Sequence, residues 1–328
     1  MSDPAMPLGP LEIGASVRES AVPARPQRLQ AVWSIFDALA GLDAFEVGAT
    51  MTLVLLFFYV DGFWYLKIPV VVIAVAGVLY RPLLTTSNYW FAIAVFSAAS
   101  AYQNWYTIDN HKYLMLYWCI ALSVAAASSD PRATLRFNAK WLIALAFSFA
   151  TVWKLMSKDF LDASFFYNNL LTEDRFQTLA KWIGGVPTTA FAATADALHE
   201  LKRLEHPALA VKIYDSARLL AFARFMTWWT VILEGTIAAA FLVPERFQLS
   251  RLRNPALLVF LLTTYTAASV VGFGWVLAIM GYVQAPDDAR WTKRLYLLAF
   301  ALIFIYSGPW SNFFTGVSKL AAGGAPTP

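Results

Sequence analysis

The sequence has few of the residues from which metal and redox sites are usually built. It contains one cysteine, Cys119, and three histidines, His111, His199 and His206, in 328 residues. One cysteine excludes a disulfide within this chain. The histidines belong to no HExxH motif and have no CxxC beside them, and neither a glycine-rich phosphate loop nor a GxSxG elbow occurs. The sequence therefore predicts no metal centre, no phosphate loop and no serine nucleophile of that kind.

Charge is also scarce. Charged residues make up 14% of the chain and hydrophobic residues 59%, with a mean hydropathy of +0.55, which is far more apolar than a soluble domain. The net charge is +4, but the lysines and arginines lie in short loops between apolar runs, where they set membrane topology. We expect an all-α protein, a polytopic helical membrane bundle, and no nucleic-acid partner.

The apolar runs predict eight or nine membrane spans, because each approaches the length of about 20 residues that a crossing helix needs. One run, 255–283, is too long for a straight crossing and contains Gly272, Phe273 and Gly274. It forms either one broken helix or a full span plus a re-entrant piece, giving eight spans if it crosses once and nine if it crosses twice. The other expected spans are 44–66, 68–80, 88–105, 112–128, 141–157, 225–243 and 295–310.

The remaining segments are more polar or richer in small residues. Residues 29–42 place apolar side chains on one helical face, as in an interfacial helix. Residues 158–224 are the one sizeable segment of low hydropathy, and we expect helices there that cap the bundle. The resulting division is a disordered tail over 1–28, the interfacial helix over 29–42, spans one to five over 43–157, the extramembrane cap over 158–224, the later spans over 225–310 and a tail over 311–328.

Loop charge predicts the orientation, because lysine and arginine accumulate on the cytoplasmic side. A cytoplasmic N-terminus places three basic groups inside, whereas the opposite loops carry little more than Lys67 and Lys112. If 255–283 crosses twice, a fourth group joins them. We expect a multi-pass protein of the inner (plasma) membrane. The three groups are Arg18, Arg25 and Arg28; Arg132, Arg136 and Lys140; and Arg246, Arg251 and Arg253. The fourth group is Arg290, Lys293 and Arg294.

This topology brings several polar residues to the outer end of the bundle. Asp61, His111 and Lys154 reach the outer level, and Glu234 lies roughly 13 Å deeper, near the middle of its span. A charge at mid-bilayer costs about 2.5–3.5 kcal/mol on insertion scales. Lys154 either snorkels or pairs with a partner, whereas Glu234 needs a proton or a partner. Together these groups are candidates for an outward-facing polar cavity.

Aromatic residues, including Trp105 and Tyr113, gather at the same level. Such residues form the interfacial belts of membrane proteins. They are also suited to wall a site for a flat lipid or a quinone. Both interpretations stay open at this point.

Three groups of residues resemble the HTTM family, the membrane domain shared by vitamin K-dependent gamma-carboxylase and many bacterial proteins. The resemblance extends from about residue 44 to 310, and its most specific element is the NHxYL pattern. The residues that carry it are Asp109-Asn110-His111-Lys112-Tyr113-Leu114, Lys154-Leu155 with the later Phe160 and Asp162-Ala163, and Glu234.

The resemblance implies a membrane enzyme that oxidises a reduced quinone with oxygen and uses the resulting base for carboxylation. His111 matches a histidine of the quinone site, and Lys154 matches the first lysine of a pair. The second lysine, to which activation is assigned, is Leu155 here. A histidine that many relatives carry is also missing, because Thr263, Thr264 and Tyr265 occupy its region.

The residues support three hypotheses of different classes. The first is a carboxylase-like quinone oxidoreductase with His111, Lys154 and Glu234 as catalytic groups and His111, Tyr113, Trp105 and Asp61 around the cofactor. The second is a noncatalytic scaffold or subunit, or a maturation or immunity partner of a secreted peptide, that docks a protein through 158–224. The third is a small-molecule transporter that depends on Glu234, although no inverted repeat stands out. All three include membrane lipid as a partner.

Overall fold

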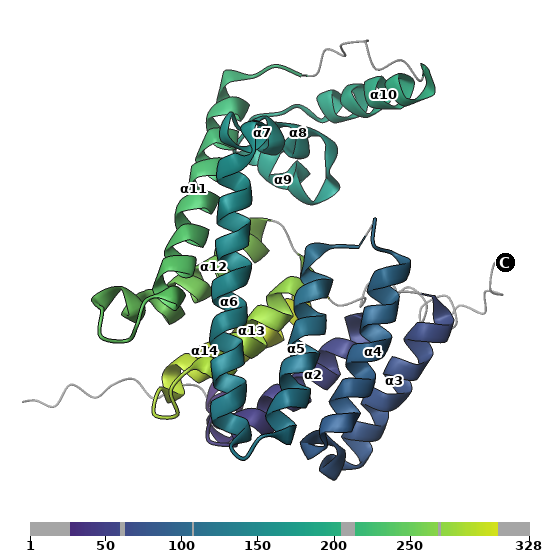
Figure 1. The fold of residues 1–328 in the computed structure, drawn as a ribbon. Coiled ribbons are helices and arrows are strands. Elements are labelled where there is room, and N and C mark those ends of the chain that lie inside the picture. The colour runs from purple at the N-terminus through teal and green to yellow at the C-terminus, as the bar shows by residue number, and fades with distance from the viewer. Residues whose placement is uncertain (1–26, 60–62, 107, 205–213, 268–269, 308–328) are drawn as a thin grey trace, which may run out of the picture.

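The computed structural model describes residues 27–59, 63–106, 108–204, 214–267 and 270–307. Within these ranges every regular element is a helix and no strand occurs (Figure 1), which confirms the predicted all-α class. The elements in chain order are α1 (Gln27–Ala40), α2 (Ala44–Tyr59), α3 (Trp64–Leu79), η1 (Arg81–Thr85), α4 (Ser87–Gln103), α5 (Asn110–Ala127), α6 (Pro131–Met156), α7 (Lys158–Leu161), α8 (Ser164–Thr172), α9 (Asp174–Trp182), α10 (Thr188–Leu204), α11 (Ala217–Leu242), η2 (Gln248–Leu252), α12 (Arg253–Ala267), α13 (Val271–Gln284) and α14 (Arg290–Ser307).

Three of the sequence predictions fall wholly or largely outside these ranges. They concern the tail over 1–28, the tail over 311–328 and the polar residue Asp61. The interfacial helix expected over 29–42 corresponds to α1, and the helical cap expected within 158–224 contains α7, α8, α9 and α10.

The helices pack around two separate hydrophobic cores. The larger core is built by α2 to α6 together with the later helices α11 to α14. The smaller core lies among α7 to α10 and the first half of α11, with Phe160, Leu170 and Leu219 at its centre. Figure 1 shows α7 to α10 at one end of α6 and α11, away from the larger bundle. We call these four short helices the cap.

Helices α6 and α11 connect the bundle to the cap. Each contains 26 residues, which corresponds to about 39 Å. α6 begins where Asp130 accepts a hydrogen bond from the Ala133 amide at 3.0 Å, with Pro131 in the first turn. α11 begins where the Ser216 hydroxyl accepts from the Leu219 amide. The Asp130 and Ser216 side chains thus satisfy backbone amides of the first helical turns, which have no partner inside the helix.

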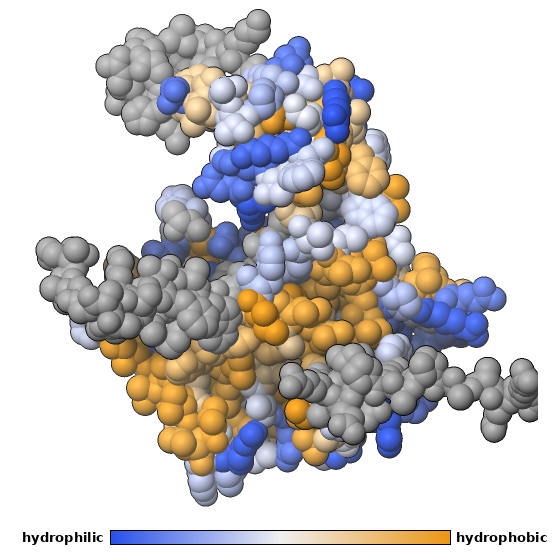
Figure 2. All heavy atoms as spheres, turned by 180° about the vertical axis from the view of Figure 1, so that it is seen from behind, coloured by the Kyte–Doolittle hydropathy of each residue, from blue (hydrophilic) through white to orange (hydrophobic). Residues whose placement is uncertain are grey.

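Among the described residues, α6 and α11 are the two helices long and apolar enough to cross a membrane. A third candidate joins the end of α1 to α2 through a bend of 117°. Figure 2 shows hydrophobic side chains over much of the larger bundle and hydrophilic ones gathered over the cap and the opposite rim. Exposed apolar surface of this extent marks a membrane-interaction surface. The protein therefore contains helices that can span a membrane.

The long apolar run 255–283 is broken into two helices. The side-chain amide of Gln284, the last residue of α13, donates to Asn254 Oδ1 at the start of α12 over 2.5 Å. Because these two ends meet, α12 and α13 form an antiparallel hairpin. Near its tip the Tyr265 hydroxyl donates to the Val270 carbonyl, and Gly274 leaves room for the Tyr265 ring. With 15 and 14 residues, each arm reaches about 21–23 Å.

Close packing of α13 against α14 depends on Gly281. A Cβ atom at this position would overlap the ring of Tyr296, which is fully buried. We expect Gly281→Ala to lower the free energy of unfolding by about 1–3 kcal/mol through overpacking. Thermal unfolding in detergent measures the effect. The control is Gly235→Ala, where the added methyl meets Thr151 Cγ2 at an ordinary 3.6 Å; equal stability of the two variants contradicts the packing argument.

Candidate functional site

Lys154 and Glu234 form an ion pair between the two long helices. Lys154 lies in the last turn of α6 and Glu234 lies within α11. The Nζ atom is 2.5 Å from Oε2, and the side chains are 18% and 8% exposed. The sequence left open whether Lys154 snorkels or pairs, and the structure shows a pair.

The pair forms at a point where α6 and α11 pack closely. Gly235, next to Glu234, faces the Thr151 methyl group one turn before Lys154. A Cβ atom at Gly235 would lie 3.6 Å from this methyl group, an ordinary contact distance, so the approach of the helices does not depend on the glycine. On the cap side, the ring of Phe160 in α7 lies 5.5 Å from Nζ, within the range of a cation–π contact. The ammonium group is therefore enclosed by α6, α7 and α11.

This geometry limits what Lys154 can do chemically. Its positive charge is balanced by Glu234, and its polar contacts among the described residues end there. Stabilisation of an oxyanion requires donors already aimed at the developing charge. Lys154 would have to leave Glu234 before it could supply such a donor. Leu155, the next residue in the chain, is half exposed and adds no charge.

His111 belongs to a third helix, α5. It is the second residue of α5 and is buried, with its ring centroid 6.4 Å from that of Phe273 in α13. Its Nε2 is 3.8 Å from Asp109 Oδ2, which is longer than a hydrogen bond. The hydrogen bonds, ion pairs and ring contacts of Lys154 and Glu234 do not include His111. The three predicted catalytic groups are thus one pair and one separate residue.

Trp105 and Tyr113, predicted beside a quinone, do come together. They line one hollow of about 400 Å³ between the end of α4 and the start of α5. His111 is not part of this lining. It precedes Tyr113 by two residues, which places it about 200° away around the helix. The lining residues are Ala98, Ala101, Tyr102, Trp105, Tyr113 and Leu116.

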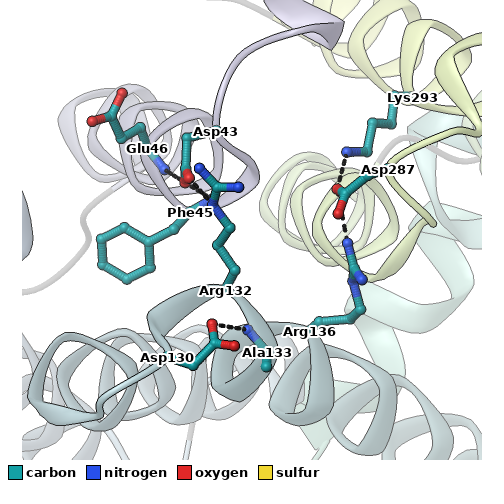
Figure 3. A network of polar contacts seen from close by, with 9 residues as sticks. All are labelled: Asp43, Phe45, Glu46, Asp130, Arg132, Ala133, Arg136, Asp287 and Lys293. Carbon is teal, nitrogen blue, oxygen red and sulfur yellow. Dashed lines mark hydrogen bonds and ion pairs between the residues drawn. The ribbon is translucent and has the colours of Figure 1, made fainter.

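Sequence reasoning missed a polar network at the opposite end of α6 (Figure 3). Asp287, in the loop between α13 and α14, contacts Arg136 at 2.8 Å and Lys293 at 2.9 Å. Arg132 pairs with Asp43 at the start of α2. Hydrogen bonds from Lys293 and Arg136 lower the pKa of Asp287 to about 2.

The network joins three separate parts of the chain at one end of the bundle, which we call the basic end. Arg294 of α14 pairs there with Asp37 of α1. Lys293 is 1% exposed, and its Nζ lies 5.4 Å from the Tyr282 ring. The basic groups assigned to the cytoplasmic side were the one signal of this network in the sequence. The aspartates between them carried no comparable pattern.

Within the ranges that the structure describes, no group of three or more histidine, cysteine, aspartate or glutamate side chains is placed to hold a metal ion. Neither a family model nor a curated protein nor a solved structure matches the chain. The resemblance to the HTTM family therefore stays a prediction, and the chemistry rests on the geometry of this chain.

Proposed function

We propose that the protein is an HTTM-like, multi-pass membrane protein that binds a quinone or a similar flat-ringed lipid in the hollow between α4 and α5. The observation that carries the proposal is the meeting of Trp105 and Tyr113 across that hollow. Trp105 lies in the turn after α4 and Tyr113 lies in α5, and both were predicted from the sequence as cofactor neighbours.

The lining of the hollow suits a flat ring. Stacking of an aromatic ring on a flat ligand contributes about 0.5–1.5 kcal/mol of stabilisation beyond the burial of apolar surface. The small side chains of Ala98 and Ala101 leave space beneath such a ring. The hydroxyls of Tyr102 and Tyr113 and the indole N–H of Trp105 are the side-chain donors that the lining offers to a quinone carbonyl. A volume of about 400 Å³ lies in the usual range of small-molecule sites.

The proposal includes a topology with nine membrane-embedded helices, α2 to α6 and α11 to α14. The α12–α13 hairpin starts and ends at the same side, and the ion pair between Arg136 and Asp287 keeps the following loop at the basic end. Placing this end in the cytoplasm satisfies the bias of lysine and arginine toward that side. The hollow and the cap then belong to the outer side, where a membrane quinone arrives laterally from the lipid.

In this proposal Lys154 and Glu234 hold α6 and α11 together beneath the cap and do not catalyse. Carboxylase-like chemistry requires the histidine, the lysine and the carboxylate around one substrate atom, since misplacement by about 1 Å already costs 10²-fold in rate. The closed ion pair, and the fact that its contacts do not include His111, favour binding over turnover. Reduced quinone and oxygen should therefore give no oxidation above a protein-free control.

Quinone binding tests the proposal directly. We expect Trp105→Ala and Tyr113→Ala to weaken co-retention of a quinone with the purified protein by about tenfold each, corresponding to about 1.4 kcal/mol of lost stacking and hydrogen bonding. Retention is measured by quinone absorbance after equilibration in detergent.

The control for quinone binding is Trp153→Ala, which removes an exposed tryptophan of α6 outside the hollow. This variant should retain quinone like the wild type. Equal retention by all four proteins, or no retention by any of them, contradicts the proposed site.

A further inference from the structure

A second cavity lies at the basic end, far from the hollow of α4 and α5. It has a volume of about 550 Å³ and is bounded by α1, α2, η1 and α14. Most of its wall is apolar, formed by Val47, Met51 and Val54 of α2 and by Leu297 and Phe300 of α14. Two charged residues, Arg81 and Glu46, belong to the same lining. A cavity with apolar walls and a few polar groups is typical of a ligand site.

Arg81 has no carboxylate partner among the described residues, whereas four other basic residues at this end have one. Arg132, Arg136, Lys293 and Arg294 are each paired with an aspartate. Arg81 Nη1 instead donates to the Thr50 hydroxyl at 2.6 Å, and among the described residues it makes no ion pair. Its charge is therefore available to an anionic group that enters the cavity.

Glu46 supplies the opposite charge. It is exposed, and its carboxylate has no ion-pair partner in the part of the chain that the structure describes. Thr50, one turn after Glu46 in α2, accepts a hydrogen bond from Arg81 and donates to the backbone carbonyl of Glu46 at 2.8 Å. Arg81 and Glu46 thus border one cavity without contacting each other. The separation leaves room for a ligand that carries both signs.

We propose that this cavity binds a glycerophospholipid with a zwitterionic headgroup, such as phosphatidylethanolamine. The phosphate contacts Arg81, the headgroup amine contacts Glu46, and an acyl chain lies along the apolar wall between α2 and α14. Arginine and phosphate form charge-assisted hydrogen bonds, which are about twice as strong as neutral ones. An anionic headgroup without an amine leaves Glu46 unpaired. The bend of 117° between α1 and α2 turns α1 across the same end of the bundle, as for a helix at the headgroup level.

Competition between two lipids tests this site. The protein is reconstituted in nanodiscs that contain equal amounts of phosphatidylethanolamine and phosphatidylglycerol, and the lipids that stay bound after detergent extraction are counted by native mass spectrometry. We expect about tenfold more bound phosphatidylethanolamine than phosphatidylglycerol. Arg81→Gln should reduce the bound phosphatidylethanolamine by about tenfold, and Glu46→Gln should remove the preference between the lipids.

Matched variants separate the headgroup contacts from general charge effects. Arg251→Gln and Asp288→Asn remove exposed charges that line no part of this cavity, and both should keep the wild-type preference. Ala301→Phe, which fills the apolar wall, should lower retention of both lipids. The proposal is overturned if the wild type retains the two lipids equally, or if the preference survives in monodisperse Arg81→Gln and Glu46→Gln proteins.

Discussion

Replacing Lys154 by alanine is expected to lower the free energy of unfolding by about 3–5 kcal/mol, because it leaves the buried carboxylate of Glu234 without its partner. Glu234→Ala should have an effect of similar size, since the ammonium group is then the uncompensated charge. Unfolding in detergent, followed by circular dichroism, measures both. Lys158→Ala is the control, because this nearby lysine belongs to α7 and has no ion pair among the described contacts.

The double variant Lys154→Met with Glu234→Leu separates a structural pair from a catalytic one. Replacing both charges by apolar side chains removes the desolvation cost of burying them, and such exchanges are often neutral or stabilising. We expect the double variant to recover most of the stability and to bind quinone like the wild type. Wild-type stability in the single variants contradicts the role assigned to the pair, and so does loss of quinone binding in a stable double variant.

The second large effect is expected at the basic end. Asp287→Asn leaves Lys293, which is 1% exposed, without a carboxylate and also removes the partner of Arg136. Breaking a buried pair costs about 3–5 kcal/mol. We expect the lower end of this range, about 3 kcal/mol, because the side chain of Asp287 is itself 62% exposed and water screens its charge. Asp288→Asn, at the neighbouring exposed residue, should change stability little.

The same network predicts a dependence of stability on acid. The pKa of Asp287 is about 2 in the folded protein and about 3.9 for an unperturbed aspartate. Its lowered pKa contributes stability that is fully present above about pH 4 and is lost as the pH falls toward 2. The melting temperature of the wild type should therefore fall more steeply over this interval than that of Asp287→Asn. Parallel pH profiles of the two proteins contradict the network's contribution.

The sequence predicted the helices better than their ends. Hydropathy placed one span at 141–157 and another at 225–243, whereas α6 begins at Pro131 and α11 at Ala217. The helical turns that the predicted spans left out contain charged residues. Hydropathy indicates which residues are apolar enough for lipid, and it does not show where a helix begins. Arg132 and Arg136 remain in α6 because aspartates of other segments pair with them. Such partners are not visible in a local pattern.

The sequence also predicted only part of the candidate site, because contacts between distant segments are not visible in a local pattern. Lys154 and Glu234 were both marked by the cost of a charge in an apolar run, and they form a pair although they are 80 residues apart. Trp105 and Tyr113 also meet, because α4 and α5 are joined at that end. His111 was grouped with Tyr113 because the two residues are close in sequence. Two residues of an α-helix turn through about 200°, so the two side chains leave α5 on different sides. The docking role of 158–224 stays a prediction.

The most direct test of the account is the location of a bound quinone. The protein is reconstituted with a quinone in nanodiscs, and its structure is determined by electron cryomicroscopy. The account predicts ring density in the hollow between α4 and α5, against Trp105 and Tyr113, with the ion pair of Lys154 and Glu234 closed. Ring density beside Lys154 or His111, with the ion pair open, would contradict it.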